Sequence, residues 1–148
     1  MANYECASRT NYFRVTDEER YKELFAGLSS EDKIDDFTHK DEEGVVWHGF
    51  GSYDSIGWSD GKEPEDPDDD DEDDDQDIVD FAYELQKILP DGEAFILFES
   101  GHEKLRYVTG TALIVTKDGT EFLDLRNKAV EIAREMLGDK KWCTKCEY

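Results

Sequence analysis

Apolar residues recur at helical spacing in the stretch from residue 16 to residue 32, TDEERYKELFAGLSSED. Thr16 precedes the pattern as a candidate N-cap, and Glu19 stands three residues later, which completes a capping box. We therefore predict a helix over residues 16–32. Its apolar face has positions i, i+3, i+4 and i+7, which are Tyr21, Leu24, Phe25 and Leu28.

Two further segments have the same periodicity. Residues 77–90, DIVDFAYELQKILP, predict a helix that Pro90 ends. Residues 127–138, NKAVEIAREMLG, predict another, with Gly138 placed to close it as C′. The apolar stripe of the first is Ile78, Phe81, Ala82, Leu85, Ile88 and Leu89, and that of the second is Ala129, Ile132, Ala133, Met136 and Leu137.

Strand patterns fill the segments between these helices. We predict a strand within residues 6–15, and another over residues 45–53 that pairs with residues 34–39. Gly49 and Gly51 inside the second strand indicate a bulge or a close backbone approach. Residues 94–98 are apolar at every position, which is typical of a strand buried on both faces.

Residues 105–125 predict two strands joined by a turn at residues 117–119, Lys-Asp-Gly. The expected order is thus β-α-β-β-α-β-β-β-α. This order predicts an α+β fold, with a mostly antiparallel sheet and helices packed on one face. The length of 148 residues fits a single domain spanning residues 1–148.

Composition adds a strong charge to this picture. Hydrophobic residues make up 37% of the chain and aromatic residues 12%, which is enough for a core, but the formal net charge is −22. Such a charge repels nucleic acid and anionic membranes and favours basic partners. The first residues lack the basic and apolar regions of a signal peptide, and no apolar run approaches the roughly 20 residues of a membrane span. We expect a cytoplasmic protein that binds neither nucleic acid nor membrane directly.

One segment concentrates the charge. Ten of the twelve residues from Asp66 to Asp77 are acidic, and we expect a flexible loop insertion at residues 59–76. An extended chain advances about 3.3 Å per residue, close to the roughly 3.4 Å between phosphates along one DNA strand. The segment could therefore occupy a groove that neutralises phosphates. The candidate partner-binding residues are Glu63, Glu65, Asp66, Asp68, Asp69, Asp70, Asp71, Glu72, Asp73, Asp74 and Asp75.

The sequence gives only weak signals for metal binding. An EF-hand loop starting at Asp66 would need Gly at its sixth position and Glu at its twelfth, where the chain has Asp71 and Asp77. Cys143 and Cys146 have the C-x-x-C spacing of half a zinc site, which Cys6 with His48 or His102 could complete only if the chain ends meet. We expect no specific metal site and no cofactor.

An enzyme is the third possibility. Its pocket would join residues from the segments around His48 and His102. An enzyme should have one cavity that both histidines line, which distinguishes it from the other two possibilities. If they lie apart, this hypothesis fails. The residues in question are Trp47, His48, Tyr53, Glu99 and His102.

The stretches RTNYFRV, GFGSYDSI, ESGHEKLRYVTG and MLGDKKW resemble those of small acidic proteins encoded on phages and integrative elements of Firmicutes. In size and charge the chain is similar to anti-CRISPR inhibitors and other DNA mimics. The resemblance implies a basic nucleic-acid-binding partner, which would be a Cas9-like nuclease or a restriction enzyme. Carboxylates of this chain could pair with the arginines of such a partner. We rank such a non-enzymatic inhibitor first, a non-catalytic accessory protein with an acidic spacer second, and an enzyme last.

Overall fold

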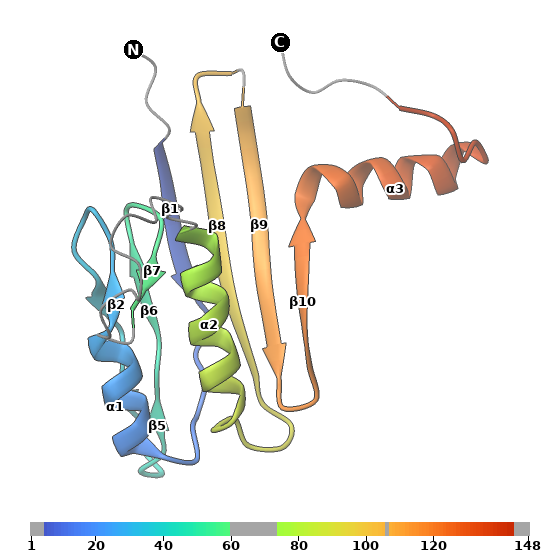
Figure 1. Ribbon diagram of the computed structural model, residues 1–148. Coiled ribbons are helices and arrows are strands. Elements are labelled where there is room, and N and C mark those ends of the chain that lie inside the picture. Colours follow the sequence, from blue (N-terminus) through green and yellow to red (C-terminus); the bar gives the residue numbers. More distant parts are fainter. Residues whose placement is uncertain (1–4, 60–73, 106, 144–148) are drawn as a thin grey trace, which may run out of the picture.

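The computed structural model describes residues 5–59, 74–105 and 107–143, and its architecture is α+β, as the sequence predicts (Figure 1). Six antiparallel strands form the main sheet in the order β10-β9-β8-β1-β6-β3. Two small ladders, β2-β7 and β4-β5, accompany it. The strands are β1 (Glu5–Thr10), β2 (Leu28–Ser29), β3 (Asp35–Asp36), β4 (His39–Lys40), β5 (Val46–Trp47), β6 (Phe50–Ser52), β7 (Gly57–Trp58), β8 (Ala94–Glu103), β9 (Tyr107–Thr116) and β10 (Gly119–Asp124).

Of the helices in the described residues, two pack on the same face of the sheet (Figure 1). They are α1 (Glu18–Ala26) and α2 (Asp74–Gln86). The third, α3 (Leu125–Leu137), projects from the end of β10 away from the sheet (Figure 1), and none of its residues is buried. Gly138 closes α3 in the left-handed conformation, as predicted from the sequence. No helix in the described ranges is long and apolar enough to cross a membrane.

The first helix differs from the prediction at both ends. Asp17, not Thr16, is the N-cap, and its side chain accepts a hydrogen bond from the Arg20 amide. The backbone N–H and hydroxyl of Thr16 instead donate to the Ile88 carbonyl just after α2, so this residue joins two helices. The helix ends at Ala26 because Gly27 caps it and the chain then pairs with β7, so the extension to residue 32 was wrong.

The second helix begins earlier than predicted, at Asp74. Residues 74–76 therefore belong to α2 and not to the expected loop. Acidic side chains in a first helical turn are favourable because they face the positive end of the helix dipole. α2 ends at Gln86, so the prediction that it continues to Pro90 was wrong. The apolar residues of the predicted stripe are nevertheless buried apart from the half-buried Ile78: Phe81, Ala82 and Leu85 lie on α2, and Ile88 and Leu89 lie just after it.

The prediction that residues 94–98 are buried on both faces was wrong. Phe95 and Leu97 are buried under the helices, whereas Phe98 on the opposite face is 51% exposed. In an antiparallel sheet covered on one side, alternate residues face alternate environments, and an apolar run does not change that geometry. The outer face of β8 therefore carries apolar residues that the described chain leaves open.

The predicted strand over residues 45–53 is interrupted at its centre. β5 pairs with β4 and β6 pairs with β3, as expected for residues 34–39, but His48 between them bridges Phe13. The close approach predicted at Gly51 is confirmed, since a Cβ there would lie 2.8 Å from the Ser8 carbonyl oxygen. The predicted turn at residues 117–119 joins β9 to β10, whose register begins with Gly119 opposite Thr116.

The core is a cluster of aromatic rings between the sheet and the two packed helices. Phe13, Phe50, Phe81 and Phe95 have no exposed surface. The ring centroids of Phe13 and Phe95 lie 5.1 Å apart, and that of Phe81 lies 5.9 Å from both Phe50 and Phe95. Edge-to-face and tilted contacts at these distances are favourable for aromatic pairs. This cluster holds α2, the helix that follows the acidic segment, against the sheet.

Candidate functional site

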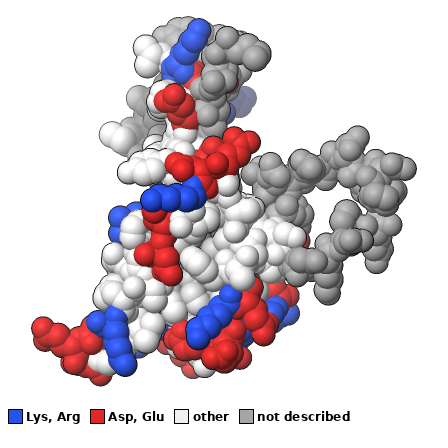
Figure 2. Space-filling view, turned by 90° about the vertical axis from the view of Figure 1, so that its left-hand side faces the viewer, with Lys and Arg blue, Asp and Glu red and all other residues white. Residues whose placement is uncertain are grey.

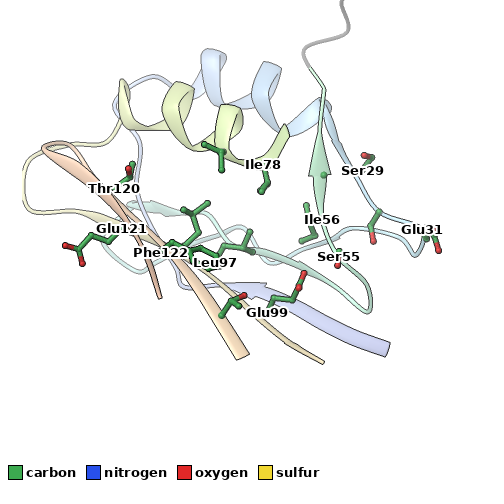
Figure 3. A pocket seen from close by; sticks show the side chains of 15 residues that line it. Ser29, Glu31, Ser55, Ile56, Ile78, Leu97, Glu99, Thr120, Glu121 and Phe122 are labelled. Carbon is green, nitrogen blue, oxygen red and sulfur yellow. The ribbon is translucent and has the colours of Figure 1, made fainter. Parts of the chain in front are cut away.

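A groove opens beside α2, on the helix-covered face of the sheet (Figure 3). Its volume is about 790 Å³. Ile78 lines it from α2 and Ile56 from just before β7, while the sheet supplies Leu97 and Phe122 (Figure 3). The cross-strand register explains why these residues meet, because Leu113 pairs with both Leu97 and Phe122 and so places all three on one face.

The apolar floor of the groove is not filled by the described chain. Phe122, on the edge strand β10, is 67% exposed, although it points to the same face as the buried Leu97. On this same face α1 and α2 cover the strands away from the β10 edge, and no helix of the described residues covers β10 (Figure 1). A groove with an exposed apolar floor is suited to bind an apolar side chain or helix face.

Carboxylates and hydroxyls line the groove around this floor. Glu99 accepts a 3.4 Å hydrogen bond from the Ser8 hydroxyl, and Glu31 is exposed at the end that β2 supplies. The hydroxyl of Ser52, next to the groove, donates to that of Ser30 at 2.9 Å. Glu121 lies at the β10 edge with its carboxylate turned outward (Figure 3). The groove therefore matches a ligand that is apolar on one side and basic at its margins.

The acidic segment is attached at this groove. The chain leaves the described residues after β7 and re-enters them at the start of α2, and Gly57 and Ile78 on these two elements both line the groove. Two of the predicted binding residues, Asp74 and Asp75, lie in the first turn of α2. The other nine, from Glu63 to Asp73, lie outside the described residues.

Charge is distributed unevenly over the described part of the chain. It has 28 acidic and 14 basic residues, so that its formal charge is −14 even without the segment 60–73. On the side that carries α1 and the β2–β7 ladder, Asp and Glu are interspersed with Lys and Arg around an area of uncharged residues (Figure 2). The stretch from Leu125 to Cys143 is the exception, with five basic and three acidic residues.

The two histidines proposed for an enzyme pocket do not come together. His48 is buried; its Nε2 lies 2.7 Å from the Glu18 carboxylate and its ring centroid 4.0 Å from that of Tyr21. His102 is exposed at the far end of β8, where its Nε2 lies 3.7 Å from a Glu5 carboxylate oxygen. His102 lies opposite Glu5 and His48 lies opposite Phe13. Glu5 and Phe13 are eight residues apart, which separates the two histidines by roughly 26 Å of extended chain.

His48 has a structural environment. The Thr38 hydroxyl lies 3.2 Å from its Nδ1, so both ring nitrogens have partners. The neighbouring Tyr21 is 4% exposed, and burial raises the pKa of its hydroxyl well above the ordinary value. These groups tie the start of α1 to the strand break between β5 and β6.

The cysteines within the described residues are both free thiols. The Cys6 thiol lies 3.4 Å from the Ser55 hydroxyl, and its partial burial raises the pKa of the thiol. Cys143 is exposed, and Cys146 lies outside the described residues. Within the described ranges, no three His, Cys, Asp or Glu side chains are grouped so that they could hold a metal ion.

The groove itself was not predicted from the sequence. Its floor depends on the register of β8, β9 and β10, and its rim on residues about 20 to 90 positions earlier in the chain. The one available signal was the alternation that puts Leu113 and Phe122 on one face of a predicted hairpin. Comparison of the chain with protein-family models, with curated proteins and with solved structures gives no match.

Proposed function

We propose that this chain is an acidic interaction protein that inhibits a nucleic-acid-binding enzyme by occupying its basic surface. The observation that carries the proposal is the distribution of negative charge. The described residues have a formal charge of −14, and the segment 60–73, which connects β7 to α2 beside the groove, adds ten acidic residues against one lysine. A partner surface that binds a polynucleotide through cationic side chains could bind this dense array of carboxylates instead.

The proposed mechanism is competition for cationic side chains. Arginine binds carboxylate and phosphate with the same two parallel hydrogen bonds, so an aspartate can take the place of a phosphate oxygen pair. In an extended chain, the carboxylates of residues 68–73 would be spaced closely enough to contact several such arginines at once. Enzymes with suitable channels include Cas9-like nucleases and restriction enzymes, and these are the partner classes we propose.

The body of the protein supports the acidic segment in this proposal. Glu31 and Glu99 line the groove near the start of α2, so their charges add to the field at that end of the molecule. The aromatic core holds α2 and β7 against each other, with the Trp58 and Phe81 ring centroids 6.2 Å apart. Both attachment points of the segment are thus fixed, which reduces the entropy lost when a partner binds.

The test is a DNA-cleavage assay with a guide-loaded Cas9-like nuclease and, separately, a restriction enzyme. The wild-type chain is expected to inhibit cleavage, and excess substrate DNA is expected to relieve the inhibition. A variant with Asn at positions 68–71 and 73–75 and Gln at 72 is expected to lose inhibition while its circular dichroism spectrum is unchanged.

A three-charge comparison separates position from total charge. Asp69→Asn, Asp70→Asn and Asp71→Asn together are expected to weaken inhibition at least tenfold. The matched control removes three exposed carboxylates elsewhere, with Glu42→Gln, Glu43→Gln and Asp118→Asn. If both variants weaken inhibition equally, net charge alone is responsible, and the role given to the acidic segment is wrong.

A further inference from the structure

The C-terminal helix has an apolar stripe that the described chain leaves largely exposed. Among its residues, Ile132 is 45% exposed, Leu137 60%, Leu125 61% and Met136 82%. With Ala129 and Ala133 they recur at i, i+4, i+7, i+8, i+11 and i+12, which is one face of a helix. Such a face in a water-soluble domain normally packs against another element.

The helix needs that packing in order to be stable. α3 has 13 residues, and isolated helices of about 12–15 residues are marginal in water, because most helical stability in proteins comes from a packed apolar face. Its main anchor is at the first residue, where the Leu125 side chain lies against Gly110 of β9 so closely that a Cβ on Gly110 would be 3.1 Å away. The remaining turns extend from this anchor (Figure 1).

The connection to β10 prevents the helix from folding back on its own sheet. Asp124 is both the last residue of β10 and the N-cap of α3, so no loop residue lies between them. A strand–helix connection that reverses direction commonly uses about 2–6 residues. α3 therefore leaves the sheet at the end of β10, and the floor beside α2 stays open in the same chain. Elements joined by short hinges in this way are the ones that two chains exchange.

The groove beside α2 complements the exposed stripe of α3 in shape and charge. Its floor is apolar, and Glu31 and Glu99 line its margins. The stretch from Leu125 to Cys143 has a formal charge of +2, whereas the rest of the chain carries −24. α3 is about 20 Å long and β9 about 33 Å, so the helix fits along the sheet. β10, next to the groove, is an edge of the sheet, so a second chain can approach from that side.

We propose that two copies of this chain exchange their C-terminal helices, with α3 of each lying in the groove of the other. The apolar stripe of α3 covers Phe122 and Leu97, and its basic residues face the carboxylates at the groove margins. The interface is reciprocal, as in most symmetric dimers. The inference is independent of the proposed function, because it concerns the groove and α3 and not the acidic segment.

Sedimentation equilibrium at 0.15 M salt and above tests the dimer, since a charge of −22 on each copy must be screened. The wild-type chain is expected to have twice its 17.1 kDa mass. Ile132→Ser with Met136→Ser is expected to weaken the dimer at least tenfold, whereas Asn127→Ser with Glu131→Gln on the polar face should not. A wild-type chain that remains monomeric up to about 1 mM would overturn the proposal.

A second pair of variants tests the groove. Phe122→Ser alters the groove floor, and Phe98→Ser alters a comparably exposed ring on the opposite face of the sheet. Only Phe122→Ser is expected to weaken the dimer. Equal mixing of the groove variant with the α3 variant is expected to restore a dimer with one intact interface. If mixing restores nothing, or if Phe98→Ser has the larger effect, the α3 helices pair elsewhere and the assignment to the groove is wrong.

Discussion

Replacing Phe81 by alanine should be among the most damaging changes in the molecule. Phe81 has no exposed surface, and its ring centroid lies 5.9 Å from those of Phe50 and Phe95 and 6.2 Å from that of Trp58. Truncating a buried Phe to Ala costs about 3–5 kcal/mol of unfolding free energy. The three ring contacts, each worth about 0.5–1.5 kcal/mol beyond burial, place the expected loss at the upper end, near 4–5 kcal/mol.

Urea unfolding followed by tryptophan fluorescence measures this loss. With a denaturant slope of about 2 kcal/mol per molar, the midpoint should fall by roughly 2 M. Tyr83, two residues away on the same helix and 51% exposed, is the control, and its replacement by alanine should cost at most about 1 kcal/mol. Phe81→Leu, expected to lose about 1–2 kcal/mol, keeps the test informative if the alanine variant does not fold. Equal midpoint shifts for Phe81→Ala and Tyr83→Ala would refute the packing of α2 described above.

Three other predictions follow from single contacts. Gly51→Ala should lose about 1–3 kcal/mol in the same urea assay because its Cβ would meet a backbone oxygen, whereas Gly119→Ala, with nothing within 4 Å, should change little; equal losses would contradict this. The hydrogen bond that the Trp47 indole N–H donates to Asp41 lowers the pKa of that carboxyl. Its stabilisation is complete above the unfolded pKa of about 3.9 and is lost as pH falls through the lower folded value. The melting temperature of Asp41→Asn should therefore fall less than that of the wild type below pH 4. Burial raises the pKa of the Cys6 thiol, so alkylation followed by mass spectrometry should modify it more slowly than the exposed thiol at residue 143; a faster reaction at Cys6 would contradict its burial.

The sequence was sufficient for the helices and the hairpin because their signals are local. The spacing of Phe81, Ala82 and Leu85 identifies a helix face wherever the helix packs, and Lys-Asp-Gly between two strand-forming segments identifies a turn. Helix ends were less predictable, because Thr16 and Asp17 are both good N-caps. The choice between them depends on the Ile88 carbonyl, 72 residues away, which Thr16 binds.

The groove and the projecting helix could not be predicted for a different reason. An apolar stripe such as the one with Ile132 and Met136 predicts a helix that packs on the protein's own sheet. Whether it does so depends on the number of residues between β10 and α3, and here there are none. Periodicity indicates that a face needs a partner and does not indicate which chain provides it.

The two proposals combine in a simple way. A dimer formed by exchange of α3 carries two acidic segments, each attached beside a groove. Two segments on one particle bind a surface with two cationic sites more tightly than either alone, since the second contact becomes intramolecular. A monomeric variant that still inhibits, but with weaker apparent affinity, is the expected outcome if both proposals are right.

The most direct test of the central claim is the salt dependence of binding to a guide-loaded Cas9-like nuclease, measured by titration calorimetry between 0.05 and 0.5 M salt, both about threefold from physiological ionic strength. For the wild-type chain, the logarithm of the association constant should fall steeply and linearly with the logarithm of salt concentration, as it does when phosphates are displaced. The variant neutralised at residues 68–75 should bind far more weakly, with a much shallower slope. Equal affinities and equal slopes for the two chains would contradict the claim.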